Sequence, residues 1–347
     1  MKRIIKYSIS IIIIMAVIAA FLFFILSDSR DEAELNKTYA LQEDNQLIVY
    51  TAHKPEVYEP VIKEFEERTG IWVEVISGGT TEMLERIASD NGKDSGDVMF
   101  GGGVDSLNAY SDYFVSYKPS QSEVLDPTYR SSENKWTAFS KLPIVFIYNS
   151  KLVYSAGTPR SWSELLSSRW KGKIAFAAPG KSGTSYTALS TMIQVLSSSS
   201  EKNPMTEDEI IEAFTANLDE NVSNGSGDVL DEVVSGTRLV GVTLEEAALK
   251  RIAEGEDLGM VYPREGTSAV PDGTAILKNA PHEKNAQLFL DFTVSEDVQQ
   301  LLVDKCCRRS VRTDIAQSEQ IEEVPYDLTW SSEHQKEILE KWTTLLP

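Results

Sequence analysis

The feature that most constrains the fold is a repeated succession of a short β-rich run, a loop rich in glycine or hydroxyl groups, and an amphipathic helix. Residues 47–51 read LIVYT, and helical periodicity then covers 58–68, where Val61, Ile62 and Phe65 share one face. Residues 71–76 alternate like a strand and lead through SGGTT into a second helix. This succession predicts an α/β fold with open, mostly parallel sheets.

The same pattern restarts further along the chain. Strands are predicted at 97–100, 142–148, 173–177, 239–243, 259–263 and 274–277, and helices at 162–166, from about 186, and at 210–218, 227–235, 286–293, 298–303 and 332–345. The sequence Pro271-Asp272-Gly273 predicts a turn, and the strand at 259–263 is a candidate for the return to the first half. Two α/β halves joined by central strands would leave a cleft between them.

Ligands of such sheets bind at the carboxyl ends of the strands. In this chain those ends carry His53, Gly79, Thr80, Gly102, Gly103, Ser182, Gly183, Thr184, Ser185 and Glu245. Backbone N–H groups at a helix N-terminus favour an anion, and serine and threonine hydroxyls add neutral donors. The loops at 77–81 and 180–185 could therefore clamp one phosphate or carboxylate from two sides. The alternative is that their hydroxyls only cap helices.

The amino terminus indicates export. Lys2, Arg3 and Lys6 precede an apolar run at 9–26, and acidic residues follow from Asp28. The run has the minimum length of a membrane span, and bulky residues occupy the place where a cleavage site needs small ones. We expect an uncleaved anchor at 1–27, with a removed signal peptide as the alternative, and a polar tether at 28–46.

Composition excludes several classes of protein. The net charge of −20 argues against nucleic acid, because phosphate backbones are bound by clusters of Lys and Arg. Three histidines without a close pair disfavour a catalytic zinc site, so we expect no metal and no cofactor. The adjacent cysteines Cys306 and Cys307 form free thiols or a strained vicinal disulfide, and we assign them no function. No nucleophile elbow, triad or paired-carboxylate spacing stands out, so we expect no enzyme. The enzyme alternative is an exported phosphatase, which would need a cluster of metal ligands.

Four segments carry a family resemblance. VYTAHKPEVYEPVIKEFEERTGIWVEVISGGTTEMLERI (49–87), GKIAFAAPGKSGTSYTAL, MVYPREGTSAVPDGTAIL and RRSVRTD occur in this order and cover most of 47–315. They resemble solute-binding proteins of ABC importers, in the branch that binds ferric iron, phosphonates and sugar phosphates. The resemblance implies a two-lobe class II periplasmic-binding-protein fold that closes on its ligand by a hinge motion. By the same analogy, lobe 1 would be 47–142 plus about 265–347, and lobe 2 would be 143–264.

The resemblance also bears on the ligand. Ferric-binding members use adjacent tyrosines, whereas the matching stretch here reads GVTLEEA (241–247) without a tyrosine, which disfavours iron. Sugar-phosphate binders place a glutamate where Glu245 stands, but their upstream His-Asp pair is replaced by NVSNGS (221–226), which puts a hexose phosphate in doubt. A smaller organophosphate or an aminophosphonate stays open.

We therefore expect an extracytoplasmic, monomeric solute-binding protein of an ABC importer that captures a small anionic organophosphate, sugar phosphate or phosphonate by hinge closure. Its partner would be an ABC permease. The alternatives are a ligand-sensing protein that docks on the outer domain of a membrane histidine kinase, and a ferric-iron binding protein.

Overall fold

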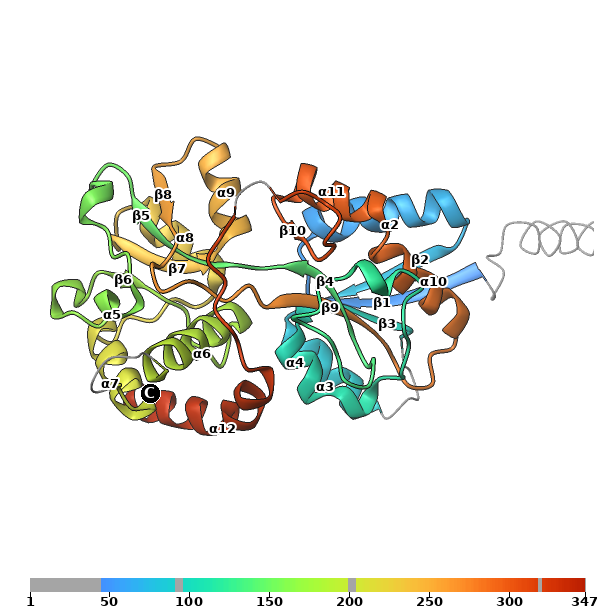
Figure 1. The fold of residues 1–347 in the computed structure, drawn as a ribbon, viewed down its shortest axis with the longest axis horizontal. Helices are drawn as coiled ribbons and strands as arrows, with labels where there is room; N and C mark the ends of the chain where they lie inside the picture. Colours follow the sequence, from blue (N-terminus) through green and yellow to red (C-terminus); the bar gives the residue numbers. More distant parts are fainter. Residues whose placement is uncertain (1–44, 91–95, 199–203, 318–319, 347) are drawn as a thin grey trace, which may run out of the picture. The chain divides into compact units, whose positions relative to one another are not determined.

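The computed structural model describes residues 45–90, 96–198, 204–317 and 320–346. The predicted anchor at 1–27 and nearly all of the predicted tether at 28–46 lie outside these residues. Leu47–Pro347 form one compact unit, and its two lobes each contain a sheet (Figure 1).

The first lobe is built on a six-stranded sheet with the strand order β10-β4-β9-β3-β1-β2. Its strands are β1 (Gln46–Thr51), β2 (Trp72–Ser77), β3 (Val98–Gly103), β4 (Thr137–Lys141), β9 (Pro271–Ile276) and β10 (Arg309–Ser310). β1 and β3 run parallel, whereas β9 is antiparallel to both β3 and β4, and β10 is antiparallel to β4. The sheet is therefore mixed, and the expectation of a mostly parallel sheet was wrong.

Five helices pack on this sheet. They are α2 (Pro55–Thr69), α3 (Thr80–Asp90), α4 (Val104–Ala109), α10 (Glu283–Thr293) and α11 (Glu296–Cys306). α2 has a proline at its first turn and ends at Gly70, whose φ of 70° is the left-handed conformation that glycine adopts without strain. Val61, Ile62 and Phe65, which the periodicity placed on one face, are all buried in a core that includes residues of α10 and α11.

The second lobe is built on a four-stranded sheet with the order β6-β7-β5-β8. Its strands are β5 (Ile144–Asn149), β6 (Ile174–Ala175), β7 (Val240–Leu244) and β8 (Leu258–Val261). Its helices are α5 (Trp162–Leu165), α6 (Gly183–Ser197), α7 (Glu207–Leu218), α8 (Ser226–Val234) and α9 (Glu245–Ala253). Short 3-10 helices occur at Ser111–Tyr113, Ser122–Val124, Ser155–Gly157 and Ser168–Trp170.

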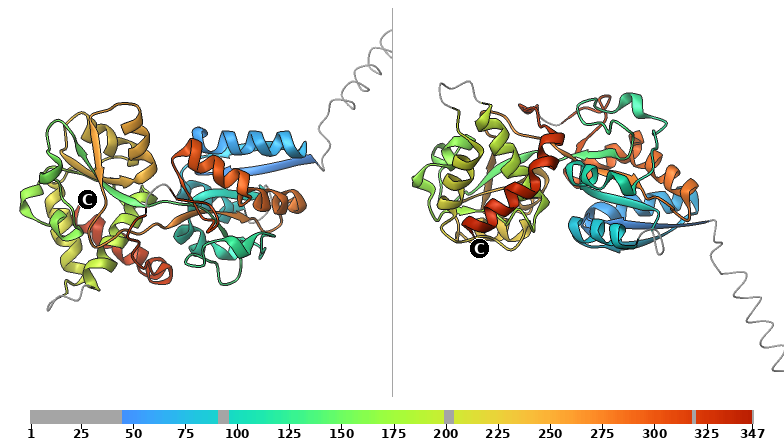
Figure 2. Two further views of the ribbon diagram at one scale, coloured as in Figure 1. Left: turned by 45° about the horizontal axis from the view of Figure 1, so that its top comes forward. Right: turned by 90° about the horizontal axis from the view of Figure 1, so that it is seen from below.

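Extended segments connect the two lobes. β4 and β5 are separated only by Leu142 and Pro143, and the segment between β8 and β9 runs beside them, since the Ile144 N–H donates to the Ser268 carbonyl at 3.2 Å. A further segment after β10 joins them, where the Thr267 N–H donates to the Glu322 carbonyl at 2.9 Å. These connections form the predicted hinge region, and Figure 2 shows them from two further sides.

Two local expectations were wrong. Pro271-Asp272-Gly273 is no turn: these residues begin β9, where Asp272 is opposite Ser140 of β4 and accepts two hydrogen bonds from it. A strand tolerates this sequence because the Asp272 carboxylate has partners inside the sheet. The strand at 259–263 does not return to the first lobe either, because β8 pairs with β5.

The last helix also differs from the expected boundary. α12 (Leu328–Leu345) was assigned to lobe 1 with the rest of 265–347, but Ile338 and Trp342 pack in the apolar core of the second lobe. Its start approaches α4 of the first lobe (Figure 1), and Leu328 packs there beside Tyr326. α12 packs with α6 and α7, since the Tyr186 hydroxyl of α6 donates to the Ser331 carbonyl and Lys341 pairs with Glu212 of α7 at 3.4 Å.

Candidate functional site

A cleft of about 690 Å³ lies between the two lobes. The first lobe lines it with the ends of β1 and β3 and the starts of α3 and α4. The second lobe lines it with the loop before α6, the first turns of α6 and the start of α8. Gln335 and Leu339 of α12 complete the wall.

Most residues predicted from the strand ends meet in this one cleft. They are His53, Gly79, Thr80, Gly102, Gly103, Ser182, Gly183 and Thr184. Ser185 and Glu245 are not among the lining residues that the structure describes. Ser185 is the third residue of α6 and turns into the lobe, where it is buried.

The N-terminus of α6 presents hydrogen-bond donors to the cleft. Ser182 is the N-cap residue, and its Oγ accepts a hydrogen bond from the Ser185 N–H at 3.3 Å. A helix offers no internal acceptor to its first amides, so the N–H groups of Gly183 and Thr184 are left for a ligand. The 15-residue helix adds the positive end of its dipole.

On the first-lobe wall of the cleft, glycines at the end of β3 allow the backbone to approach neighbouring side chains closely. Gly102 has a φ of +87°, and a Cβ there would lie 2.7 Å from the Thr80 Cγ2. Gly101 has a φ of +102°, and a Cβ there would touch the His53 ring at 3.0 Å. Glycine at position 102 lets the backbone of β3 pass close to Thr80 at the start of α3, and glycine at position 101 leaves room for the His53 ring.

His53 is buried at the floor of the cleft. Its ring packs edge-on against Phe100, with centroids 4.6 Å apart, and its Nδ1 lies 3.4 Å from the Asp272 carboxylate. Burial, reinforced by the positive charge of Arg308, lowers the pKa of His53 well below its usual value. The ring is therefore neutral, and its buried Nε2 has no hydrogen-bond partner among the described residues.

Arg308 joins the lobes beneath the cleft. Its guanidinium donates to Asp272, to Ser140 Oγ at 2.9 Å and to Glu246 Oε2 at 2.6 Å, and Glu246 belongs to the second lobe. Burial raises the pKa of Asp272, and Arg308 opposes that rise. Arg308 also lines the cleft.

Glu245 has a partner within the protein. Its carboxylate, 3% exposed, accepts two hydrogen bonds of 2.7 Å from Arg309 of β10 and a third from the Tyr262 hydroxyl. The sequence prediction gave this carboxylate to the ligand. In the structure it instead pairs with an arginine of the other lobe.

Sequence reasoning missed Asp105, which follows the glycine run at the end of β3 and lines the cleft. Its Oδ1 accepts from the Ser106 N–H at 2.8 Å, and its Oδ2 accepts from Thr187 Oγ1 of α6, in the other lobe, at 3.3 Å. Tyr110 also lines the cleft. An acid two residues after the strand-end glycines was the available signal.

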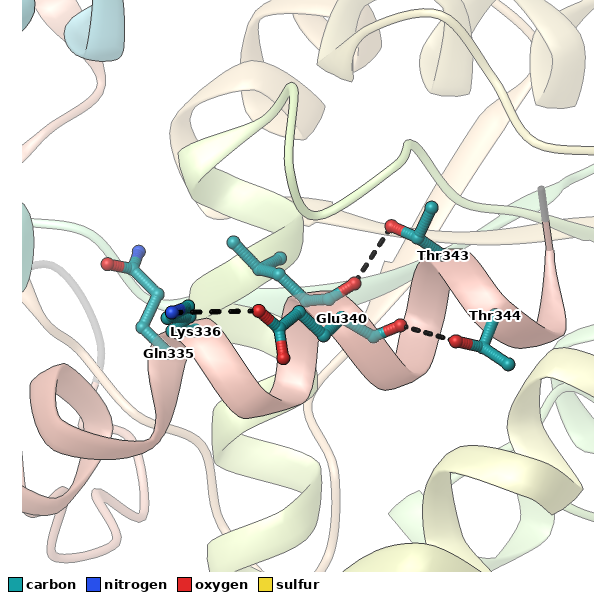
Figure 3. A pocket seen from close by; sticks show the side chains of 6 residues that line it. Gln335, Lys336, Glu340, Thr343 and Thr344 are labelled. Carbon is teal, nitrogen blue, oxygen red and sulfur yellow. Dashed lines mark hydrogen bonds and ion pairs between the residues drawn. The ribbon is translucent and has the colours of Figure 1, made fainter.

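A second cavity of about 620 Å³ lies along α12 and shares Gln335 and Leu339 with the cleft (Figure 3). Lys336 pairs with Glu340 at 3.8 Å, and the hydroxyls of Thr343 and Thr344 donate to carbonyls of their own helix. Because these polar groups already have partners on their own helix, this surface offers a solute few free donors.

In the described ranges, no cluster of three or more His, Cys, Asp or Glu side chains is placed to hold a metal ion. No helix of the described segments is long and apolar enough to span a membrane. Cys306 and Cys307 are free thiols.

Comparison with known proteins agrees with this architecture. A family model described as bacterial extracellular solute-binding protein matches residues 104–330. Iron uptake protein A1 of Synechocystis sp. is 26% identical over 275 residues, which is 75% of this chain and 74% of the relative. A periplasmic protein of Salmonella typhi named for 2-aminoethylphosphonate binding is 22% identical over 271 residues, 76% of each chain.

Solved structures show the same fold. The periplasmic binding protein AfuA of Actinobacillus pleuropneumoniae, with fructose-6-phosphate bound, superposes with a TM-score of 0.77 at 22% identity, covering 87% of this chain and 98% of that one. A protein titled as mediating two-component signal transduction superposes with a TM-score of 0.72 at 26% identity, covering 85% of this chain and all of that one. The expected two-lobe periplasmic-binding fold is confirmed.

Proposed function

Because the chain belongs to the family of bacterial extracellular solute-binding proteins, we propose that it captures a small anionic organophosphate, sugar phosphate or phosphonate in the cleft. The observation that carries the proposal is the N-terminus of α6, whose capped first turn aims free N–H groups and the Thr184 hydroxyl into the cleft. A tetrahedral oxyanion accepts several such donors at once.

The residues proposed to contact the solute come from both lobes, so binding would draw the lobes together. They are His53, Gly79, Thr80, Gly102, Gly103, Ser182, Gly183 and Thr184. Hinge closure then follows from contacts that exist only when both walls touch one ligand.

The contacts favour an oxyanion over ferric iron. Iron needs several hard oxygen ligands with free lone pairs. Glu245, whose carboxylate could offer hard oxygen ligands, is neutralised by Arg309, and Glu246 is neutralised by Arg308. Tyr262, which lies beside Glu245, donates its hydroxyl to that carboxylate.

The acidic surface works against an anionic solute. With a net charge of −20, the long-range field repels the ligand. Salt screens that field within about 10 Å, whereas the N–H groups at α6 act at hydrogen-bond distance. Binding is therefore expected to strengthen with moderate salt.

The proposal is tested by thermal unfolding of the full chain in detergent, followed by tryptophan fluorescence. The panel holds sugar phosphates, glycerol phosphates, phosphonates, inorganic phosphate and ferric citrate, because a ligand that binds only the folded state raises Tm. We expect a shift with an organophosphorus compound. Thr184→Val, which removes one hydroxyl, should weaken that binding by about tenfold.

Thr344→Val serves as the matched control, since Thr344 lies on the far end of α12 and bonds to its own helix. It should bind like the wild type. A shift with ferric citrate alone, or equal binding by Thr184→Val, would contradict the anion site.

The proposed partner of the loaded protein is an ABC permease. The 26% identity to a two-component signalling protein favours a sensor kinase as the second candidate. Deleting the gene separates the two: loss of labelled solute uptake supports transport, whereas loss of solute-induced transcription with intact uptake supports sensing. We propose binding without bond chemistry, so incubation with the bound phosphate ester should release no phosphate.

As a member of this family the protein acts outside the cytoplasm. We propose that the apolar run at 9–26, behind Lys2, Arg3 and Lys6, stays uncleaved and holds it at the outer face of the membrane. An uncleaved anchor keeps the protein in the membrane pellet after carbonate extraction, whereas a cleaved one releases it.

A further inference from the structure

Asp105 is a carboxylate buried in the wall of the cleft without a basic partner. It is 5% exposed, and its hydrogen bonds come from the Ser106 N–H and the Thr187 hydroxyl, both neutral groups. Within the described segments, no Lys, Arg or His side chain forms an ion pair with it. Arg308, which lines the same cleft, is paired with Asp272 and Glu246.

An uncompensated carboxylate of this kind is costly to the empty protein. Burial raises the pKa of Asp105, because the charged form has lost water without gaining a cation. Buried charges in proteins are ordinarily paired. The missing positive charge can be brought by the solute, since Asp105 faces the cavity that receives it.

The contact between Asp105 and Thr187 sets the distance to the anion site. Thr187 lies four residues after Gly183 on α6, about one helical turn or 5.4 Å further along the axis. A solute whose phosphorus group sits on the N–H groups of Gly183 and Thr184 therefore reaches Asp105 with a group that is two or three bonds along its chain.

We propose that Asp105 is a specificity-determining residue that pairs with an ammonium group of the solute, carried on a short chain beside its phosphonate or phosphate. This rests on the proposed anion site at α6. The donors of the second lobe bind the phosphorus group, and the carboxylate of the first lobe binds the amine. A zwitterionic solute also evades the repulsion between the acidic protein and a pure anion.

The test uses a pair of probes that differ only in the amine, 2-aminoethylphosphonate and ethylphosphonate, titrated calorimetrically into the full chain in detergent. The wild type should bind 2-aminoethylphosphonate at least about tenfold more tightly, the size of a charge-assisted hydrogen bond. Asp105→Asn keeps the shape of the side chain and should remove that preference, so that its affinities for 2-aminoethylphosphonate and ethylphosphonate become similar.

Asp112→Asn is the matched control. Asp112 lies on the same lobe, is exposed and is not among the residues that line the cleft, so this variant changes the net charge equally. It should keep the wild-type preference, which separates a local ion pair from the long-range field. The two probes on the wild-type chain need no variant, so a folding defect of Asp105→Asn leaves the test intact.

The possible results distinguish a failure of the proposed role of Asp105 from a failure of the proposed anion site at α6. Equal affinity of the wild type for both probes overturns the role of Asp105 and leaves the anion site standing. A preference for the amine that persists in Asp105→Asn also overturns it. Binding of no phosphorus compound at all overturns both.

Discussion

At the scale of single residues, His53 shows how its surroundings set the charge of a side chain. Burial between Phe100 and Phe139 removes water from the ring, and Arg308 nearby adds repulsion, so the pKa of His53 lies well below its usual value. The neutral ring is then favoured in the folded protein, whereas the unfolded chain protonates near its ordinary pKa.

This predicts loss of stability on mild acidification. As pH falls below about 6.5, the unfolded chain binds a proton that folded His53 refuses, so the free energy of unfolding drops by up to about 1.4 kcal/mol per pH unit. Denaturant unfolding at pH 7 and pH 5 should show a smaller drop in His53→Gln than in the wild type. His334→Gln should behave like the wild type, and an equal drop in all three proteins would refute the prediction.

Asp272 acts in the opposite direction. Its pKa is raised by burial, so the folded protein binds its proton more readily than the unfolded chain, and this carboxylate opposes acid destabilisation in its own titration range. The comparison with His53→Gln isolates the histidine.

At the scale of elements, two helices begin with the same device in different places. Ser182 caps α6 beside the cleft, and Thr206 caps α7 away from it, with a reciprocal hydrogen bond from the Thr206 N–H to Glu209 at 2.9 Å. Both hydroxyls satisfy an orphan N–H of a first turn, so both stabilise the fold. Of these two helices, only α6 lines the cleft with its first turn.

Variants of the two N-cap residues, Ser182 and Thr206, distinguish an effect on the free energy of unfolding from an effect on ligand affinity. Ser182→Ala and Thr206→Ala should each lower the free energy of unfolding by about 1 kcal/mol, the usual cost of losing an N-cap. Calorimetric titration with 2-aminoethylphosphonate or another active probe should show weaker binding only for Ser182→Ala. Loss of affinity in Thr206→Ala as well would mean that helix stability, and not the cleft contact, controls binding.

At the scale of the whole molecule, α12 ties the end of the chain to the second lobe. Trp342 packs beside Phe176 and Phe214, with ring centroids 5.7 and 6.4 Å away, and Ile338 is buried in the same core. The preceding Tyr326 packs with the first lobe. The C-terminal segment therefore contributes to both cores, and the second lobe is incomplete without it.

Truncating the buried ring should destabilise the protein strongly. Trp342→Ala leaves a cavity in the core of the second lobe and should cost about 3–5 kcal/mol of the free energy of unfolding. Leu345→Ala, on the half-exposed last turn of the same helix, should cost less than about 1 kcal/mol. Guanidinium unfolding measures both, and similar costs would argue against a core role for α12.

The sequence by itself determined the local elements and the chemistry of the α6 turn. Alternation, helical periodicity and glycines at strand ends depend on neighbours a few residues away, so the positions of β1, α2, α7 and α10 were predicted to within a few residues. Ser182-Gly183-Thr184 was recognisable for the same reason, because a strand-end loop that enters a helix presents its N–H groups wherever the helix packs.

Tertiary structure decided which of the charged groups face a ligand. Glu245 and Arg309 are 64 residues apart, and Asp105 and Thr187 are 82 apart, so no local pattern announces either pair. Pairing with Arg309 makes the Glu245 carboxylate unavailable to a ligand. Asp105, which sequence reasoning missed, lies in the cleft wall beside Thr187. Whether a buried carboxylate is available to a ligand depends on the side chains that folding places beside it. For Glu245 and Asp105, these side chains belong to the other lobe.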